Sequence, residues 1–163
     1  MVSRSKAQEF LGMDKDFIGE ENMAILMTCY IEKCVIQFFE DRRIPTKTLT
    51  NRNLFKVRSD VTQFGQEKKN CFQTIEAKLM WVVKRMRPGI KTTFAFLCTR
   101  IEILDEDDWN KVQRFLQYIK GIIGRKQIIG CTELNNIDTI TNVSYAVYSD
   151  IRSHTGGTIT FGR

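Results

Sequence analysis

A long amphipathic helix is the feature of the sequence that most constrains the fold. Between residues 66 and 86, apolar side chains recur at spacings of three and four residues, so they share one side of an α-helix. These side chains are Phe72, Ile75, Leu79, Val82, Val83 and Met86. The helix must end near Arg87, because the residue before a proline, here Pro88, avoids helical backbone angles. Such a helix needs other elements against which its apolar stripe can pack.

Two shorter helices are predicted to supply those elements. The first begins at Ile90 and buries one apolar side, formed by Phe94, Leu97 and Ile101. The second follows Asp105 and ends at Gly121, because glycine commonly terminates helices. Its apolar side is formed by Trp109, Val112, Leu116 and Ile119. We therefore expect a cluster of three helices in the middle of the chain.

The N-terminal part is predicted to contain a pair of strands and a helix. Residues 9–13 and 23–27 are mainly apolar and flank an acidic turn that contains a glycine. Thr28 can cap a helix that runs to Glu40. Residues 41–65 contain Pro45 and several Thr and Asn, so they are predicted to form a long basic loop. Loops of this length are usually functional or disordered.

After Gly124 the sequence becomes rich in β-branched residues. Residues 127–129, 139–144 and 158–161 are predicted to be strands, the last of which follows a Gly-Gly turn. The whole pattern predicts an α+β fold. It has an N-terminal strand pair plus helix, a central three-helix cluster and a C-terminal partial β-sheet. At 163 residues the chain is long enough to bury a core of its own.

The charge favours a polyanionic partner. The net charge is +6, and the basic residues fall into three runs that contain no acid, at residues 42–58, 84–100 and 111–126. Acidic residues gather instead at residues 9–21 and 105–108. Each basic run can equally be a solvated face of an ordinary domain.

The cysteines and the lack of long apolar segments indicate the cellular compartment in which the protein is expected. The five cysteines are widely spaced and lie far from the single histidine, His154, so a zinc site with paired ligands is rejected. Most of them have apolar neighbours, which is typical of buried thiols in a reducing compartment. The sequence contains no signal-peptide core and no membrane span. We expect an intracellular protein, cytoplasmic or nuclear, that is not secreted and does not bind a membrane.

No complete active site is evident. Residues 105–108 are four consecutive acids, and adjacent carboxylates are the ligands of two-metal sites. They also lie at the start of a predicted helix, where the helix macrodipole favours acidic side chains and an aspartate can cap free backbone amides. We expect the capping role. His154 has no acid or nucleophilic partner that the sequence identifies, so no catalytic residue is predicted.

Several segments resemble, in order and spacing, the reverse transcriptase of copia-type retrotransposons where it runs into ribonuclease H. The clearest are residues 84–90, Lys-Arg-Met-Arg-Pro-Gly-Ile, and residues 114–121, Arg-Phe-Leu-Gln-Tyr-Ile-Lys-Gly. Residues 145–147 and 152–157 continue the match. Weaker similarities are found at residues 10–13, 27–31, 77–81, 96–100 and 107–109. The resemblance implies that residues 1–124 correspond to the thumb and connection and residues 125–163 to the start of a ribonuclease H-like sheet.

The same resemblance implies that the chain is not an enzyme. The Mg²⁺-binding polymerase motif of the family would lie before Met1. The first ribonuclease H aspartate would fall at Asn142, whose amide cannot supply an anionic Mg²⁺ ligand. Gly89 and Gln117 also depart from the family motifs. No cofactor is therefore expected here, although Mg²⁺ serves the complete enzymes.

In the family, this region grips the template and primer by the phosphate backbone. The resemblance assigns that role to basic residues, with an RNA–DNA hybrid or DNA as the partner. They are Arg42, Arg43, Lys47, Arg52, Lys84, Arg85 and Arg87. Two alternatives stay open, a domesticated protein-interaction module and a functionless remnant. An incomplete sheet would also expose unpaired strand edges, which predicts self-association.

Overall fold

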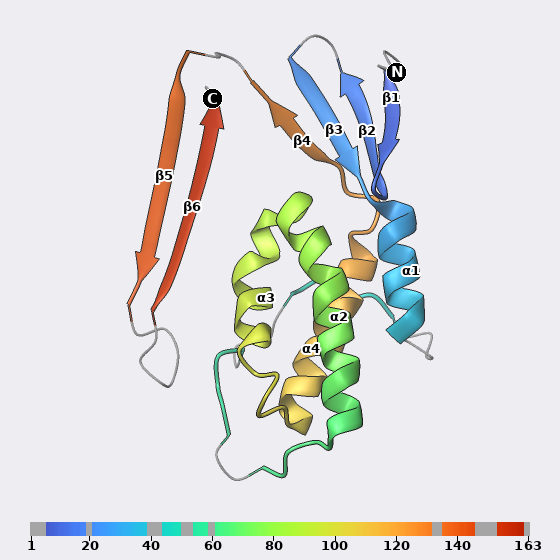
Figure 1. The fold of residues 1–163 in the computed structure, drawn as a ribbon, viewed down its shortest axis with the longest axis vertical. Coiled ribbons are helices and arrows are strands. Elements are labelled where there is room, and N and C mark those ends of the chain that lie inside the picture. The colour runs from blue at the N-terminus through green and yellow to red at the C-terminus, as the bar shows by residue number, and fades with distance from the viewer. Residues whose placement is uncertain are drawn as a thin grey trace. The chain divides into compact units, whose positions relative to one another are not determined.

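The computed structural model describes residues 6–18, 21–38, 44–49, 54–58, 61–131, 135–145 and 153–161. These residues form four α-helices, one 3₁₀ helix and two antiparallel sheets (Figure 1). The predicted α+β class is therefore confirmed. The backbone divides into two compact units. We call them the strand unit, which comprises Met1–Leu26, Phe55–Val57 and Lys126–Arg163, and the helical unit, which comprises Met27–Leu54 and Arg58–Arg125.

The larger sheet of the strand unit has four antiparallel strands in the order β1-β2-β3-β4. They are β1 (Ala7–Phe10), β2 (Met13–Ile18), β3 (Asn22–Leu26) and β4 (Gln127–Gly130). Strands β1 and β2 are joined by Leu11 and Gly12, whose φ angles are 51° and 75°. A two-residue turn with positive φ at both positions matches the right-handed twist of a hairpin.

The predicted N-terminal strands are partly wrong. The apolar segment 9–13 contains this turn, and most of the acidic segment that was expected to be a turn forms β2. Phe10 pairs with Met13 across the turn. The apolar run thus folds back on itself, because a hairpin needs only two residues with positive φ to reverse the chain.

Pairing between β3 and β4 joins distant parts of the sequence. Met23 pairs with Ile129 and Ala24 with Ile128. The predicted division after residue 124 lies next to a border between the two units, at Arg125 and Lys126. The first strands, however, group with the C-terminal strands rather than with the helices that follow them. A strand with an apolar sequence does not reveal its partner, so this pairing could not be predicted.

The second sheet is a hairpin of two long strands. Strands β5 (Ile137–Ser144) and β6 (His154–Phe161) are antiparallel, and their register runs from Ile137 opposite Phe161 to Ser144 opposite His154. Both contain the segments that were predicted to be strands, but the Gly-Gly turn expected before the last one is wrong, because Gly156 and Gly157 lie inside β6 and pair with β5. Among the described residues this sheet has no third strand.

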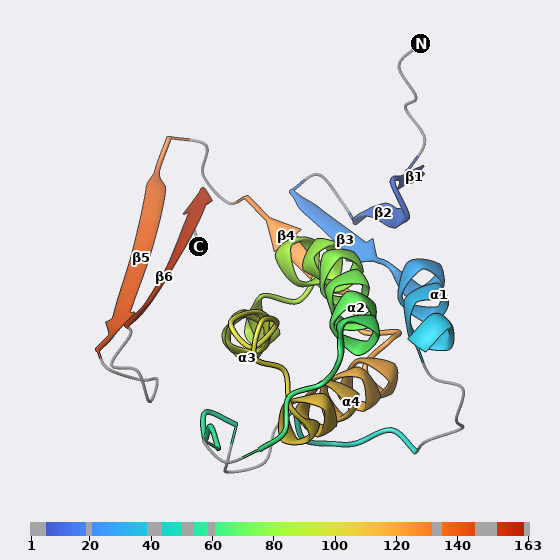
Figure 2. The ribbon, with the colours of Figure 1, turned by 60° about the horizontal axis from the view of Figure 1, so that its bottom comes forward.

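The helical unit is built from α1 (Thr28–Phe38), α2 (Gln66–Arg85), α3 (Lys91–Cys98) and α4 (Glu106–Gly121). The 3₁₀ helix η1 (Pro88–Ile90) separates α2 from α3, which confirms the predicted break. Helices α1 and α3 each contact both α2 and α4, so the cluster has four helices rather than three (Figure 2).

The core of the helical unit follows the predicted stripes. All six apolar residues of the 66–86 stripe are buried, together with Phe94 and Leu97 of α3 and Val112, Leu116 and Ile119 of α4. Ile101 is only half-buried, because α3 ends at Cys98. Leu104, in the turn before α4, is fully buried instead.

The described parts of the predicted loop, residues 44–49, 54–58 and 61–65, contain no helix or strand. Part of this segment packs on α4. A Cβ atom added to Gly121 would come within 3.3 Å of both the Pro45 Cβ and the Thr46 carbonyl oxygen. Gly121, the last residue of α4, therefore allows the segment to approach the end of the helix closely. No helix among the described residues is long and apolar enough to cross a bilayer.

Candidate nucleic-acid interface

Three helix ends meet at one end of the helical unit. The chain leaves α2, passes through η1 and enters α3 within a few residues. The C-terminus of α4 lies at the same place, because the Arg87 Nη2 donates a 2.8 Å hydrogen bond to the carbonyl oxygen of Ile122, the C-cap residue of α4. Four exposed basic residues belong to these helix ends, and we call this group the basic end. They are Lys84, Arg85, Lys91 and Arg125.

Carboxylates are absent from the sequence that builds the basic end. Residues 84–101 and 109–131 contain no aspartate or glutamate. The acids of the helical unit lie largely at the other ends of the helices: Glu67 in the first turn of α2, Glu102 after α3, and residues 105–108 at the start of α4. The placement at α2 and α4 suits the helix dipoles, which favour acids at N-termini and bases at C-termini, whereas Lys91 at the start of α3 and Glu102 after its end run against the dipole of that helix. It also leaves the stretches of sequence that form this end of the unit with basic residues and no acidic one.

Two of the predicted phosphate ligands lie together in the last turn of α2. Lys84 and Arg85 are both exposed. The Arg85 guanidinium carbon lies 4.7 Å from the centre of the Trp81 ring, and this cation–π contact holds the side chain along the helix. Trp81 itself is half-buried. Arg85 is therefore a partly ordered cation rather than a freely rotating one.

Lys47 lies near the same end. It is exposed in the segment whose Pro45 and Thr46 pack against Gly121 at the end of α4. The next residue, Thr48, accepts a 2.5 Å hydrogen bond from Arg114 Nη2, so the segment is attached to α4 on both sides of Lys47. Arg42, Arg43 and Arg52 lie outside the described residues.

Arg87 requires a correction. Its side chain is buried, with only 5% of its surface exposed, and its Nη2 donates to the Ile122 oxygen and, at 3.5 Å, to the Ile123 oxygen. Burial, together with the nearby charge of Arg125, lowers the pKa of this guanidinium. Arg87 therefore satisfies carbonyl groups at the negative end of the α4 dipole. A buried group of this kind is not presented to a phosphate in solution, so we remove it from the interface.

The acidic cluster at the start of α4 has the expected structural role. The Asp105 carboxylate accepts a 2.8 Å hydrogen bond from the Asp108 amide, which confirms the N-cap. Asp108 is 1% exposed, and its Oδ2 accepts a 2.8 Å hydrogen bond from Arg100 Nε. Lys111 binds the carboxylates of Asp107 and Asp108 at 2.9 and 3.2 Å. These carboxylates are thus occupied by a cap and by ion pairs.

Among the residues that the structure describes, no three Cys, His, Asp or Glu side chains are grouped as metal ligands would be. Asn142 lies exposed in β5, opposite Gly156 of β6.

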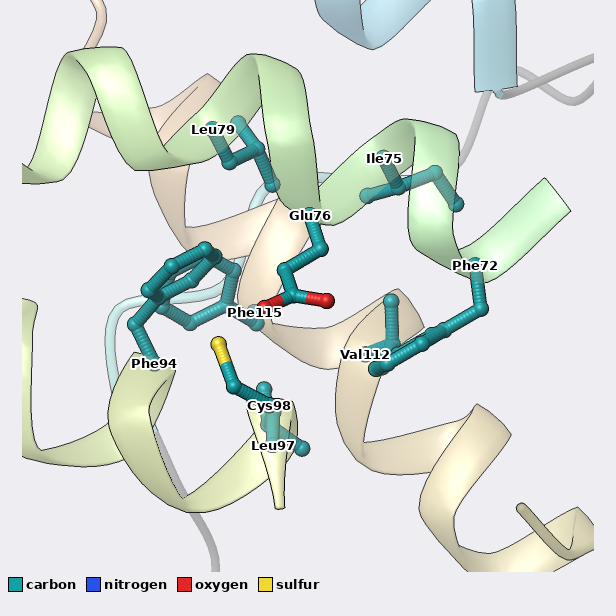
Figure 3. A pocket seen from close by; sticks show the side chains of 9 residues that line it. All are labelled: Phe72, Ile75, Glu76, Leu79, Phe94, Leu97, Cys98, Val112 and Phe115. Atoms are coloured by element: carbon teal, nitrogen blue, oxygen red, sulfur yellow. The ribbon is translucent and has the colours of Figure 1, made fainter. Parts of the chain in front are cut away.

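A small apolar cavity lies between α2, α3 and α4 (Figure 3). Its volume is about 10 Å³, which is room for about one water molecule. The Glu76 carboxylate and the Cys98 thiol point toward each other beside it. Burial, and then the hydrogen bond with Glu76, raise the pKa of the Cys98 thiol far above its usual range. A neutral, half-buried thiol is a poor nucleophile, so this cavity is a packing defect rather than a reactive site.

The chain was compared with models of known protein families, with curated proteins and with solved structures, and none of the three comparisons gave a match. The sequence-based list of ligands missed Lys91 and Arg125. Both lie in the acid-free runs, so their charge was visible. What was not visible is that α4 returns its C-terminus to the end of α2.

Proposed function

We propose that this protein binds nucleic acid through the phosphate backbone, without reading base sequence, at the basic end of the helical unit. The single observation that carries the proposal is the meeting of three helix ends, where Lys84, Arg85, Lys91 and Arg125 are exposed and the adjoining sequence contains no carboxylate. Lysine and arginine contacts to phosphates release condensed counterions and supply affinity that does not depend on sequence.

The arrangement favours a polyanion over a single small anion. The four cations come from α2, α3 and the turn after α4, so they are spread over an end of the unit rather than gathered round one point. Phosphates repeated along a backbone can each meet one of them. Lys47, which lies beside the end of α4, would add a fifth contact at the margin.

The order of the sequence motifs supports a non-catalytic derivative of a copia-type reverse transcriptase, from the region between the polymerase and ribonuclease H. An RNA–DNA hybrid is the partner that such an origin favours, with duplex DNA as the second. We propose no catalytic step. The carboxylates of Asp105, Asp107 and Asp108 are engaged in a cap and in ion pairs, and Asn142 supplies an amide where a metal site would need an anion.

The test is a salt titration of binding to a labelled RNA–DNA hybrid, with duplex DNA in parallel. Each phosphate contact contributes a slope of about −0.9 to the plot of log affinity against log salt concentration, so four contacts give a slope between about −3 and −4. The triple variant Lys84→Gln, Arg85→Gln and Lys91→Gln should weaken binding about tenfold or more and flatten the slope by about 2 to 3.

A matched control removes the same charge elsewhere. Lys33, Arg58 and Lys68 are exposed basic residues of the helical unit that lie outside the basic end. Their combined substitution by glutamine changes the net charge equally and should leave most of the affinity and slope intact. An equal loss in both triple variants would mean that only net charge matters. A folded wild-type protein that does not bind either duplex would refute the proposal.

A second candidate function, a protein-interaction module, is favoured by one separate observation. Every described side chain of the β5–β6 hairpin that can be assigned an exposure is exposed, including several large apolar ones. This observation concerns the hairpin and not the basic end, and it favours a protein partner rather than nucleic acid.

A further inference from the structure

Arg114 of α4 is a cation without an acidic partner among the described residues. None of their ion pairs involves it. Its Nη2 donates a 2.5 Å hydrogen bond to the hydroxyl oxygen of Thr48, which is a neutral acceptor, and its Nε is buried without a hydrogen-bond partner. Residues 44–58 and 109–131 contain no aspartate or glutamate that could approach from the same elements. An arginine that donates only to a neutral group keeps its capacity to bind an anion.

The hydroxyl of Thr48 has a donor of its own to offer. A hydroxyl carries one donor hydrogen and two acceptor lone pairs. Because the Thr48 oxygen accepts from Arg114, its hydrogen points away from the guanidinium. Thr48 is exposed, so that hydrogen is available to a ligand. Donation from a charged group also polarises the O–H bond, which makes it a stronger donor.

The segment of residues 44–49 is held along α4 in a way that keeps this pair together. The Thr46 hydroxyl donates a 3.2 Å hydrogen bond to the Thr48 carbonyl oxygen. The Thr46 carbonyl oxygen packs against Gly121, which lies two helical turns beyond Arg114. The segment therefore follows one side of α4 (Figure 2). Donors that are already fixed in position lose little freedom when a ligand binds.

Lys47 brings a second positive charge to this side of α4. It is exposed and lies between the two attachments of the segment, at Gly121 and at Arg114. Lysine, arginine and threonine side chains are the groups that commonly donate to phosphate oxygens. The surface thus combines two cations and one polarised hydroxyl, and no carboxylate from either element competes for them.

We infer that Arg114, Thr48 and Lys47 form a phosphate-binding subsite on the side of α4. Its ligand is a phosphate group, which belongs either to a nucleic acid held at the basic end or to free phosphate. The first source rests on the proposed function, whereas the second does not. Two helical turns correspond to roughly 10 Å. A duplex that follows α4 from the basic end would reach the subsite after about three base-pair steps of about 3.4 Å each.

Nuclear magnetic resonance of the ¹⁵N-labelled full chain tests the subsite and identifies the source. The signals to follow are the Arg114 Nε–H and the Thr48 amide. Inorganic phosphate is titrated against sodium chloride of equal ionic strength, and the RNA–DNA hybrid is titrated in a parallel sample. A saturable shift of both signals with inorganic phosphate would assign the site to free phosphate. A shift with the hybrid alone would assign it to the nucleic-acid backbone, which is the result we expect.

Two variants then distinguish a lost charge from a lost hydroxyl in binding of the hybrid. Arg114→Gln should weaken binding about three- to tenfold and flatten the salt slope by about 0.9. Thr48→Val keeps the shape of the side chain without the hydroxyl. It should weaken binding about threefold and leave the slope unchanged, because no cation is removed. Lys68→Gln is the matched control for charge, since Lys68 is exposed in the first turn of α2, outside both sites.

Three results would overturn the inference. The first is that neither inorganic phosphate nor the hybrid moves the two signals. The second is that the hybrid moves them but Arg114→Gln changes its binding no more than Lys68→Gln does. The third is that Thr48→Val flattens the slope as much as Arg114→Gln, which would mean that Thr48 only holds Lys47 in place.

Failure of the proposed function would look different. A chain that binds inorganic phosphate at Arg114 but does not bind the hybrid would refute nucleic-acid binding and retain the subsite. A chain that binds the hybrid through the basic end, with both signals unmoved, would retain the proposed function and refute the subsite. Circular dichroism of each variant confirms that the comparison is made between folded samples.

Discussion

Phe115 and Phe161 carry the same type of side chain, but one is buried and the other is exposed to solvent. Phe115 of α4 is 1% exposed and packs 5.8 Å, centre to centre, from the ring of Phe94. Phe161 of β6 is 48% exposed. The helical unit buries its apolar stripes within itself, whereas large apolar side chains of the β5–β6 hairpin are exposed. The first can be stable through its own contacts, and the second gains little stability from burial among the described residues.

The largest expected effect comes from truncating this pair. Phe115→Ala should lower the free energy of unfolding by about 3–5 kcal/mol, because it removes buried contacts and leaves a cavity beside the existing one. Phe161→Ala should cost less than about 1 kcal/mol in a dilute sample, where its ring already faces water. Urea unfolding followed by far-ultraviolet circular dichroism measures both.

A similar loss of stability in both variants at low concentration would contradict this contrast between the helical unit and the hairpin. That result would mean that the hairpin is covered within the chain.

The next effect concerns a polar part of the helical unit. Asp108→Ala should cost about 3 kcal/mol or more, because it leaves the buried Arg100 guanidinium without its 2.8 Å partner. Asp107→Ala is the matched control, since this carboxylate is more exposed and its ion pair among the described residues is with Lys111; it should cost less than about 1 kcal/mol. Thermal or urea unfolding measures the difference. Equal losses would show that the cluster acts through total charge at the helix N-terminus.

A smaller effect should distinguish a structural role from a nucleic-acid-binding role for two residues of the same basic run, Arg87 and Lys84. Arg87→Gln should cost about 1–3 kcal/mol of stability, because the charged hydrogen bond to the Ile122 carbonyl is lost. It should leave the salt slope of nucleic-acid binding unchanged. Lys84→Gln should do the reverse, with stability within about 0.5 kcal/mol of wild type and a slope flatter by about 0.9. A flatter slope for Arg87→Gln in a folded sample would return Arg87 to the interface.

These two residues also show how far the sequence could lead. Lys84, Arg85 and Arg87 look alike in sequence, and all three lie near a helix end that periodicity and Pro88 predict. Only the position of α4 turns Arg87 inward, and that position depends on packing between helices that are distant in sequence. The α2 stripe and its end were predictable because they depend on spacing within one helix.

The strands were predictable in the same limited sense. Their β-branched composition revealed β5 and β6, whose segments 139–144 and 158–161 lie inside the observed strands. Neither the β3–β4 pairing nor the shared face of Ile137 and Phe161 on the β5–β6 hairpin follows from one strand alone. These two side chains share a face only because the register places them opposite each other, and register is a property of the pair.

The smallest expected effect lies in the turn between β1 and β2. Leu11 has φ of 51°, a conformation that costs a residue with a Cβ roughly 1 kcal/mol and that glycine adopts freely. The Leu11 side chain is 63% exposed, so removing it sacrifices little burial. Leu11→Gly should therefore be neutral or stabilise the β1–β2 hairpin by up to about 1 kcal/mol, despite the greater freedom of glycine in the unfolded chain.

Hydrogen exchange of residues 7–18 measures this change locally, with the amides of α2 as an internal reference. Leu11→Val is the opposing control, because a β-branched residue tolerates positive φ less well than leucine and should speed exchange in the same strands. If Leu11→Gly instead loosened β1 and β2 while α2 stayed unchanged, the exposed leucine would have to contribute a contact that outweighs its strained backbone. The strand unit would then resemble the helical unit in depending on side-chain packing even at its turns.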